Sequence, residues 1–230
     1  MPSALQPTRT DRDTRGQTMI GAMLWVLCLE YFLVQAIAVA ESSGYSMARH
    51  EISYLGLAGC GSFVRAADGA ALDICSPGHA LFNGGIVLLG ALMAGGAILT
   101  RAAWPASHAA RSGLALLCAG AVGASMVGLW PVDTNPMLHG IGAVLALGIG
   151  NVGMGLLGYS VSGSQRWIGG IGLAAGIVST AAFILYLAHV DFGLGAGTME
   201  RVAGYPKTLW LALAGAALLA AALRQRRAGA

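Results

Sequence analysis

Charged side chains are scarce in this chain. Asp, Glu, Lys and Arg make up only 10% of its 230 residues, whereas soluble domains carry roughly a quarter. Hydrophobic residues make up 56%, and the mean hydropathy is +0.69. So few charges cannot cover a water-facing surface, which excludes an ordinary soluble domain and predicts an integral membrane protein. Arginines anchored at lipid headgroups explain the net charge of +3, and nothing predicts nucleic acid as a partner.

The sequence also lacks the motifs of several enzyme classes. No phosphate loop or dinucleotide-binding motif follows a predicted strand, and no HExxH zinc motif occurs. The 35 glycines instead indicate close helix packing, because helices in a membrane gain by bringing their backbones together at small residues. Gly172 and Gly176 have the spacing of such a contact, and Gly142, Ala146 and Gly150 form another.

Six apolar stretches are each long enough to cross a hydrocarbon core of roughly 30 Å as a helix. We therefore predict an all-α fold, an integral membrane bundle of six transmembrane helices over residues 17–224, with a long first outer loop. The predicted spans are about 19–40, 79–100, 112–129, 137–158, 167–188 and 208–223. Residues 1–16 are expected to form a disordered basic tail, and residues 225–230 a second, short tail.

Basic residues divide unevenly between the two sides of these spans. Nine of the 13 Lys and Arg residues lie in the terminal segments and in the second and fourth connections. The other four, assigned to the outer side, are Arg49, Arg65, Arg201 and Lys207. An excess of basic residues marks cytoplasmic segments, so we predict that both termini are cytoplasmic.

Two of the four cysteines fall in the first outer loop. Cys60 and Cys75 would lie on the oxidising side of the membrane, where a disulfide between them would close a loop of about fifteen residues. Their spacing resembles no structural zinc site, so we predict the disulfide in preference to a metal. Cys28 and Cys118 lie inside spans and are expected to act as small apolar fillers.

Polar residues gather on the outer side and suggest candidate catalytic groups. Histidines and carboxylates at one membrane depth are able to hold a divalent metal and activate water. The candidates for such a hydrolase are His139, Asp133, His50 and Glu200. A plainer interpretation is that histidines near span ends are satisfied by backbone groups. The metal therefore stays one of two alternatives, and its identity is unknown.

A second set of residues is suited to binding a ligand. These candidates are Tyr45, Ser46, Ser53, Asn83, Arg201, Tyr205 and Glu30. The guanidinium of Arg201 suits a phosphate or carboxylate, although we slightly favour the alternative, a structural lock between Glu200-Arg201 and the other outer loops. Glu30 lies in the middle of the first span, where an acid must be protonated, paired or turned into the bundle. It would then either bond a polar side chain such as Asn83 or form the floor of a ligand cavity.

The polar positions form a series along the chain. The series consists of Tyr45-Ser46, Ile52-Ser53, Leu55-Gly56, Leu81-Phe82-Asn83-Gly84, Gly128, Pro131, Asp133, His139, Gly197, Glu200-Arg201, Tyr205-Pro206 and Trp210. It resembles the six-span bacterial and archaeal membrane family known as domain of unknown function 998, over about residues 19–223. That family often has an acid where this chain has Tyr54, so a role for that acid does not carry over. The resemblance implies a multi-pass protein of a prokaryotic inner or plasma membrane, with a polar outer face and no established reaction.

Three functions from different classes fit these observations. The first, which we favour, is binding of a lipid or isoprenoid-type ligand from the outer leaflet in an apolar cavity capped by polar residues. The second is a metal-dependent intramembrane hydrolase of a lipid substrate. The third is an accessory or structural subunit of a larger membrane complex, in which other membrane-protein subunits cover the polar face. A deep cavity lined by Glu30 and Asn83 would favour the first.

Overall fold

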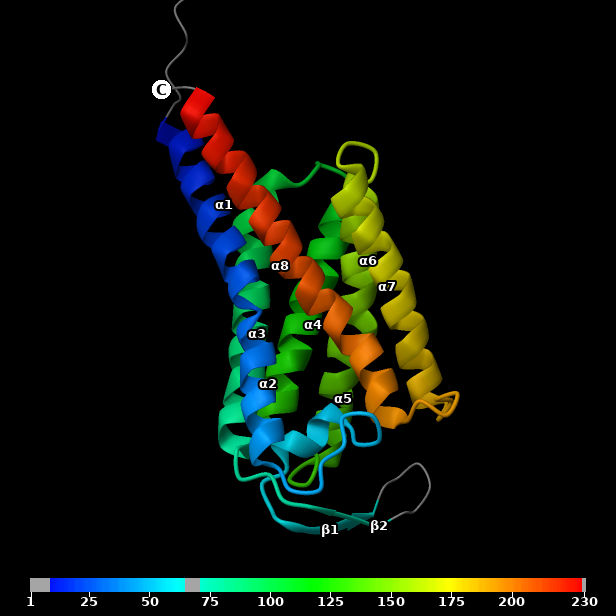
Figure 1. The fold of residues 1–230 in the computed structure, drawn as a ribbon. Coiled ribbons are helices and arrows are strands. Elements are labelled where there is room, and N and C mark those ends of the chain that lie inside the picture. The colour runs from blue at the N-terminus through cyan, green and yellow to red at the C-terminus, as the bar shows by residue number, and fades with distance from the viewer. Residues whose placement is uncertain (1–8, 65–70, 229–230) are drawn as a thin grey trace, which may run out of the picture.

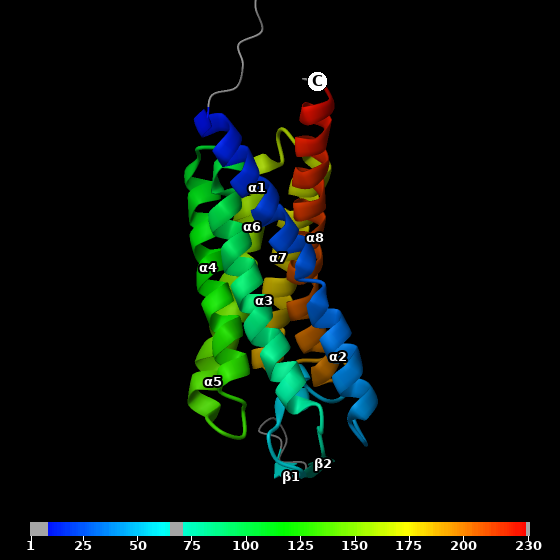
Figure 2. The ribbon, with the colours of Figure 1, turned by 90° about the vertical axis from the view of Figure 1, so that its left-hand side faces the viewer.

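A computed structural model describes residues 9–64 and 71–228 of the chain. Its α-helices are α1 (Arg9–Leu27), α2 (Glu30–Glu41), α3 (His79–Thr100), α4 (His108–Leu129), α5 (Pro136–Ala143), α6 (Gly150–Val161), α7 (Arg166–Leu187) and α8 (Ala196–Ala228). The shorter elements are the 3-10 helices η1 (Ile52–Gly56) and η2 (Arg101–Ala103), the π-helix η3 (Val144–Ile149) and the strands β1 (Gly61–Val64) and β2 (Ala71–Ile74). The long helices run side by side along one axis (Figures 1 and 2).

Six helical segments of the described chain are long and apolar enough to cross a membrane. They are Asp13–Glu41, His79–Ala103, His108–Leu129, Pro136–Val161, Arg166–Leu187 and Ala196–Arg224. The prediction of a multi-pass, six-helix membrane bundle is therefore confirmed. A small two-stranded hairpin, β1 and β2, is the part that this all-α prediction omitted.

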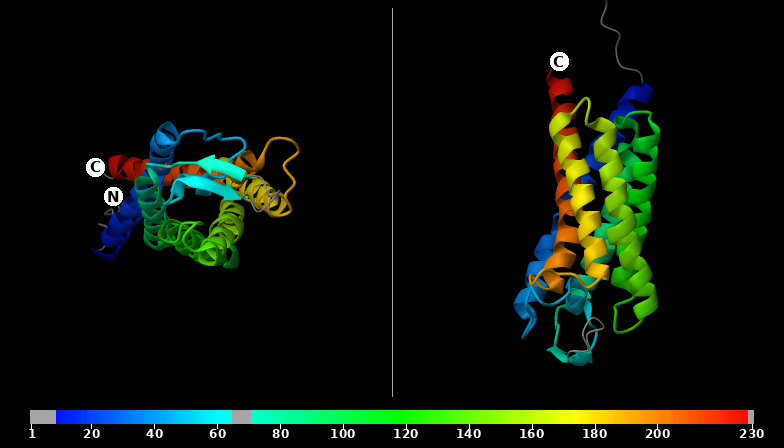
Figure 3. Two further views of the ribbon diagram at one scale, coloured as in Figure 1. Left: turned by 90° about the horizontal axis from the view of Figure 1, so that it is seen from below. Right: turned by 90° about the vertical axis from the view of Figure 1, so that its right-hand side faces the viewer.

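The two ends of the bundle differ in construction. The start of α1, the end of α8 and the α3–α4 and α6–α7 connections lie together at one end (Figure 1). The β1–β2 hairpin, η1 and the α4–α5 and α7–α8 connections lie at the other, which we call the capped end (Figures 1 and 3). The described parts of both termini thus share one end of the bundle, as the charge pattern predicts.

Small residues bring the helices together as predicted. Gly172 on α7 lies against Trp210 on α8, where a Cβ would come within 2.6 Å of the indole ring. The indole N–H of Trp210 donates to the carbonyl of Ile168 at 2.9 Å, so this buried ring keeps its polar atom satisfied. Gly176 meets Gly155 on α6 backbone to backbone. These glycines serve helix contacts, which removes any need to assign them to a ligand.

Several predicted boundaries are wrong. The first span is two helices, α1 and α2, separated by a turn at Cys28 and Leu29. The last helix begins at Ala196 instead of residue 208, so it includes Pro206 within its length. Residues 9–16 are helical, not disordered, and α8 continues into the predicted second tail as far as Ala228. Residues 1–8 and 229–230 of the two predicted tails lie outside the described part.

The first connection, residues 42–78, is held by the predicted disulfide. Cys60 and Cys75 are bonded, which confirms that prediction. The bond lies next to the Gly61–Ile74 pair of the antiparallel β1–β2 ladder. The two remaining cysteines, Cys28 and Cys118, are free and lie in spans, as expected. The disulfide and the ladder hydrogen bonds therefore hold the two strands of the hairpin together at the capped end.

Candidate functional site

Arg201 of α8 ties the first connection to the bundle. Its Nη1 group donates to the carbonyls of Met47 at 2.6 Å, His50 at 3.1 Å and Gly197 at 2.8 Å. Its Nη2 group donates to the hydroxyl of Tyr45 at 2.6 Å. The side chain is 7% exposed. A buried guanidinium with this many acceptors is a structural clasp, which is the alternative that we slightly favoured over a headgroup clamp from the sequence.

Tyr45 completes this clasp. Its hydroxyl donates to the carbonyl of Glu51 at 2.8 Å while it accepts from Arg201. Burial raises the pKa of Tyr45 well above its ordinary value, although the Arg201 charge acts in the opposite sense. The hydroxyl therefore stays protonated at neutral pH and can donate and accept at once. Ser46 shapes the same turn, because its backbone N–H donates to Nδ1 of His50 at 3.0 Å.

Glu200, the neighbour of Arg201, holds η1 in place. One oxygen of its carboxylate accepts a hydrogen bond from the backbone N–H of Ile52, the first residue of η1. That N–H belongs to the first turn of a short helix, where it has no partner within the helix, so a carboxylate is a favourable acceptor for it. All five residues of η1 are buried. Glu200 thus fixes η1 over the bundle as a cap.

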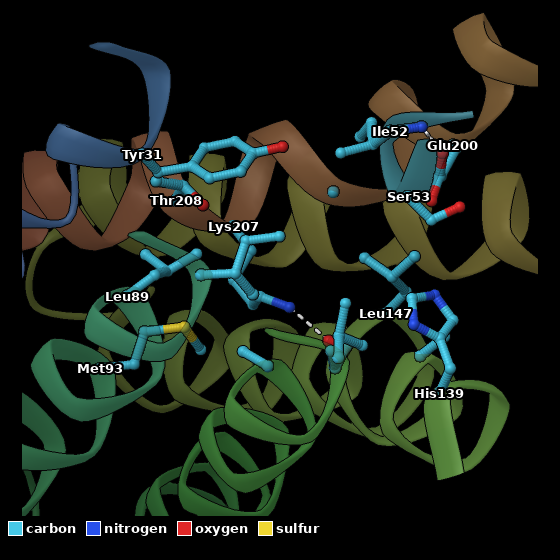
Figure 4. Close-up of a pocket in the computed structure, with 16 residues that line it drawn as sticks. Tyr31, Ile52, Ser53, Leu89, Met93, His139, Leu147, Glu200, Lys207 and Thr208 are labelled. Atoms are coloured by element: carbon cyan, nitrogen blue, oxygen red, sulfur yellow. Dashed lines mark hydrogen bonds between the residues drawn. The ribbon is translucent and has the colours of Figure 1, made fainter. Parts of the chain in front are cut away.

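A cavity lies beneath this cap. Its volume is about 90 Å³. Its walls are mostly apolar and come from α3, α4, α5, η3 and α8, with Tyr31 from α2 (Figure 4). The lining residues are Tyr31, Ile52, Ser53, Ile86, Leu89, Met93, Ala124, Val127, His139, Ala143, Ala146, Leu147, Glu200, Gly204, Lys207 and Thr208. An apolar cavity capped by polar residues is the arrangement that the favoured function requires.

Lys207 reaches across this cavity from α8 to η3. Its ammonium donates to the carbonyl of Ala146 (Figure 4). That carbonyl is available because η3 is a π-helix: the N–H of Gly150 bonds to Leu145, five residues back, instead of Ala146. Such single π-turns inside α-helices occur frequently at functional sites. Lys207 is the only lysine of the chain and is 4% exposed.

The cavity and the cap share one stretch of α8. Glu200, Gly204, Lys207 and Thr208 all line the cavity, and positions four and seven residues apart lie on one helix face. Arg201, one residue after Glu200, turns instead to Met47 and Tyr45 of the first connection. The same two helical turns therefore hold the cap in place and supply the polar groups of the cavity.

The candidate catalytic residues do not form one centre. Asp133 is exposed and accepts hydrogen bonds from the backbone N–H groups of Ala58 at 2.9 Å and Gly59 at 3.2 Å. His139 lines the cavity, but its Nδ1 atom bonds to the carbonyl of Trp130 at 3.0 Å. Asp133 and His139 thus have separate backbone partners, and these two candidate catalytic side chains do not bond to each other. Across residues 9–64 and 71–228, no three His, Cys, Asp or Glu side chains are grouped to hold a metal.

The expected cavity residues Glu30 and Asn83 are also placed elsewhere. The amide of Asn83 donates to the carbonyl of Gly56 at 2.9 Å, which anchors the end of η1. Glu30 begins α2, and its buried Oε1 atom has no hydrogen-bond partner among the described residues. Neither residue lines the cavity. A deep cavity lined by Glu30 and Asn83, which would have favoured ligand binding, is therefore not the cavity that the described residues form.

Tyr205, another ligand candidate, faces away from the cavity. Its hydroxyl donates to Gln35 of α2 at 2.9 Å. It lines an open groove of about 470 Å³ together with Met47, Ala48, Thr198, Arg201, Val202 and Pro206. The rings of Tyr205 and Tyr31 lie 6.2 Å apart, edge to face. Because Tyr31 lines the cavity, this aromatic pair stands between the cavity and the groove.

Sequence reasoning missed Lys207 and η3. It placed Lys207 in an outer connection, whereas the residue lies inside α8. One signal pointed to it: Glu200 and Lys207, seven residues apart, would share a face if that segment were helical. The π-turn at η3 has no comparable sequence signal.

Six membrane-crossing segments, with a cavity under a polar cap, define the chain as a multi-pass membrane protein of the helical-bundle class. Comparison with known families then identifies it more closely. Residues 19–217 match the family described as protein of unknown function DUF998, and the chain belongs to that family. No curated protein and no solved structure matches the chain.

Proposed function

We propose that the protein binds a lipid or isoprenoid-type ligand, taken from the outer leaflet of the membrane, in the cavity under η1. The observation that carries this proposal is an apolar cavity inside the bundle that also holds three buried ionisable side chains, His139, Glu200 and Lys207. A water-filled channel would not favour walls of Leu, Ile and Met. A purely structural core would not favour three ionisable groups beside empty apolar space.

The apolar side chains of the cavity walls suit the hydrocarbon part of a lipid. Ile86, Leu89 and Met93 form one side and Ala124 and Val127 another. Unfilled space of this kind loses packing contacts, because the lining atoms have no partners across the gap. A hydrocarbon segment in the cavity would restore them, with about 0.8 kcal/mol for each buried methylene. Ligand sites are commonly apolar with a few placed polar groups, and this cavity has that composition.

The groove beside Tyr205 supplies a route from the lipid. It lies next to the cavity, with the Tyr31–Tyr205 pair between them. Met47 and Val202, which line the groove, are exposed on the surface of the bundle. A lipid chain lying against these side chains needs only a rotation of the two rings to reach the cavity. In this proposal membrane lipids are the partners, and Tyr31 and Tyr205 control access.

Native mass spectrometry of the purified full-length protein tests this function. Two matched variants on α4 serve as probes: Val127→Phe places a ring in the cavity, whereas Val122→Phe places it on the exposed face. The wild type and Val122→Phe are expected to carry a co-purified lipid, and Val127→Phe to have lost it. A wild type without bound lipid, or folded Val127→Phe with undiminished lipid, would refute the proposal.

A further inference from the structure

The ammonium of Lys207 is the most unusual group of the cavity. Its hydrogen bond to Ala146 is made to a neutral carbonyl. Within the described part of the chain this is the only hydrogen-bond or ion-pair partner of the group. A lysine ammonium has three N–H donors, so two remain for another acceptor. Figure 4 shows the Lys207 side chain extended among the lining residues of the cavity, and the residue is buried.

Glu200 does not neutralise this charge. It lies seven residues earlier on α8, which is about 10 Å along the helix axis, and its carboxylate is bound to Ile52 in the cap. Arg201 lies one residue after Glu200 and supplies it with a nearby positive charge at the capped end. The cavity therefore has a carboxylate under the cap and an unmatched ammonium further along the helix.

Two residues with hydroxyl groups also line the cavity. Tyr31 and Thr208 line the same cavity, and neither hydroxyl has a hydrogen-bond partner among the described residues. A buried cation without an anion is costly, because the apolar surroundings do not replace its hydration. An anion with two or three oxygens would satisfy the charge of Lys207 and accept from hydroxyl donors as well.

We infer that the ligand end that reaches Lys207 is anionic, a carboxylate or a phosphate monoester carried on an apolar chain. This inference rests on the proposed function and narrows its ligand class. Lys207 acts as the selecting charge, and Tyr31 and Thr208 provide hydroxyl groups elsewhere in the cavity wall. A fatty acid or an isoprenoid monophosphate has this chemistry, and a neutral alcohol or a sterol does not.

Three probes that share a twelve-carbon alkyl chain and differ only in the head group distinguish these ligand classes. Dodecanoate, dodecyl phosphate and dodecanol are titrated against the full-length protein in amphipol, with native mass spectrometry as the readout. A hydrogen bond to a charged group distinguishes ligands by about 10- to 100-fold in affinity. We expect one or both anions to bind the wild type more tightly than dodecanol by this factor. The preferred anion then distinguishes a carboxylate from a phosphate ligand.

Two variants test whether the preference for an anionic ligand depends on Lys207. Lys207→Gln is expected to bind the anion only as tightly as dodecanol, while Arg111→Gln, which removes an exposed charge on α4, keeps the wild-type preference. If the wild type binds dodecanol as tightly as both anions, the inference is wrong although the proposed function stands. If none of the probes binds, both are wrong. A folded Lys207→Gln protein that retains the preference also overturns the inference, and the wild-type comparison decides it even where this variant fails to fold.

Discussion

The guanidinium of Arg201 and the hydroxyl of Tyr45 lie 2.6 Å apart, across a sequence separation of 156 residues. Their bond joins α8 to the first connection at the place where Glu200 holds η1. Because α8 also carries Lys207 at the cavity, any displacement of this helix would disturb the cap and the cavity together. The Arg201–Tyr45 contact therefore stabilises both the cap and the helix that carries Lys207 at the proposed binding site.

Removal of Arg201 is expected to destabilise the protein strongly. Arg201→Ala removes the bonds from the guanidinium to the carbonyls of Met47 and His50, and hydrogen bonds to a charged group contribute about 1.5–3 kcal/mol each. Thermal unfolding in detergent measures this loss. Arg49→Ala is the matched control, because Arg49 is exposed on the same connection and should change stability little. Equal melting temperatures for the two variants would contradict the clasp.

The disulfide predicts a definite thiol count. In the denatured protein without reductant, alkylation should modify Cys28 and Cys118 only, because Cys60 and Cys75 are bonded. Intact mass gives the number of labels directly, and four labels would show that the bond is absent. Replacing both bonded cysteines by Ser is expected to lower the stability by about 2–4 kcal/mol, since the bond limits the unfolded first connection.

Two glycines on α7 form a sharp comparison. A Cβ at Gly176 would lie 2.5 Å from Cα and 2.7 Å from N of Gly155, so α6 and α7 would have to move apart. A Cβ at Gly170 would meet nothing within 4 Å. We expect Gly176→Ala to cost about 1–3 kcal/mol, and Gly170→Ala to be neutral or slightly stabilising. Unfolding in detergent compares the pair. Equal stabilities would mean that α6 and α7 do not pack at these glycines.

The orientation in the membrane is open to labelling. In a chain with Cys28 and Cys118 replaced by Ala, single cysteines at Ser164 and Gly193 probe the two ends of the bundle. The charge pattern predicts that Ser164→Cys is cytoplasmic and Gly193→Cys is outside. A membrane-impermeant maleimide applied to intact cells should therefore label only Gly193→Cys. Labelling of Ser164→Cys alone would reverse the proposed topology and place the cap in the cytoplasm.

The apolar spans were predictable because hydropathy reports burial in lipid directly. The second span, about 79–100, coincides with α3 (His79–Thr100), and the disulfide followed from two cysteines in one connection. The start of α8 was not predictable in this way. Glu200 and Arg201 suggested a loop because hydropathy counts the cost of a charge and takes no account of its partners. Tyr45, Met47 and Ile52 are those partners, and they come from a distant part of the chain.

The candidate site was predicted only in part, because the sequence does not show which distant groups each polar side chain bonds to. Sequence placed Arg201, Glu200 and the Tyr45 segment together, and the structure brings them into contact. It also placed Asp133 with them, although that carboxylate caps the backbone at Ala58 and Gly59 instead. The role of Lys207 depends on the carbonyl that η3 leaves free. Residues 144–149 are nearly all aliphatic, so no apolar stripe in the sequence marks the place where the helix widens to a π-helix.

Photo-crosslinking in the native membrane tests the central claim, that the cavity binds a lipid-type ligand, most directly. A fatty acid with a photoactivatable group along its chain is supplied to cells, and the modified residues are mapped by peptide mass spectrometry. Helix α3 provides an internal control, since Leu89 lines the cavity and its neighbour Leu88 is exposed to lipid. The account predicts crosslinks at Leu89, Met93 and Val127 that Val127→Phe abolishes. Crosslinks confined to Leu88 and other exposed positions, unchanged in that variant, would contradict it.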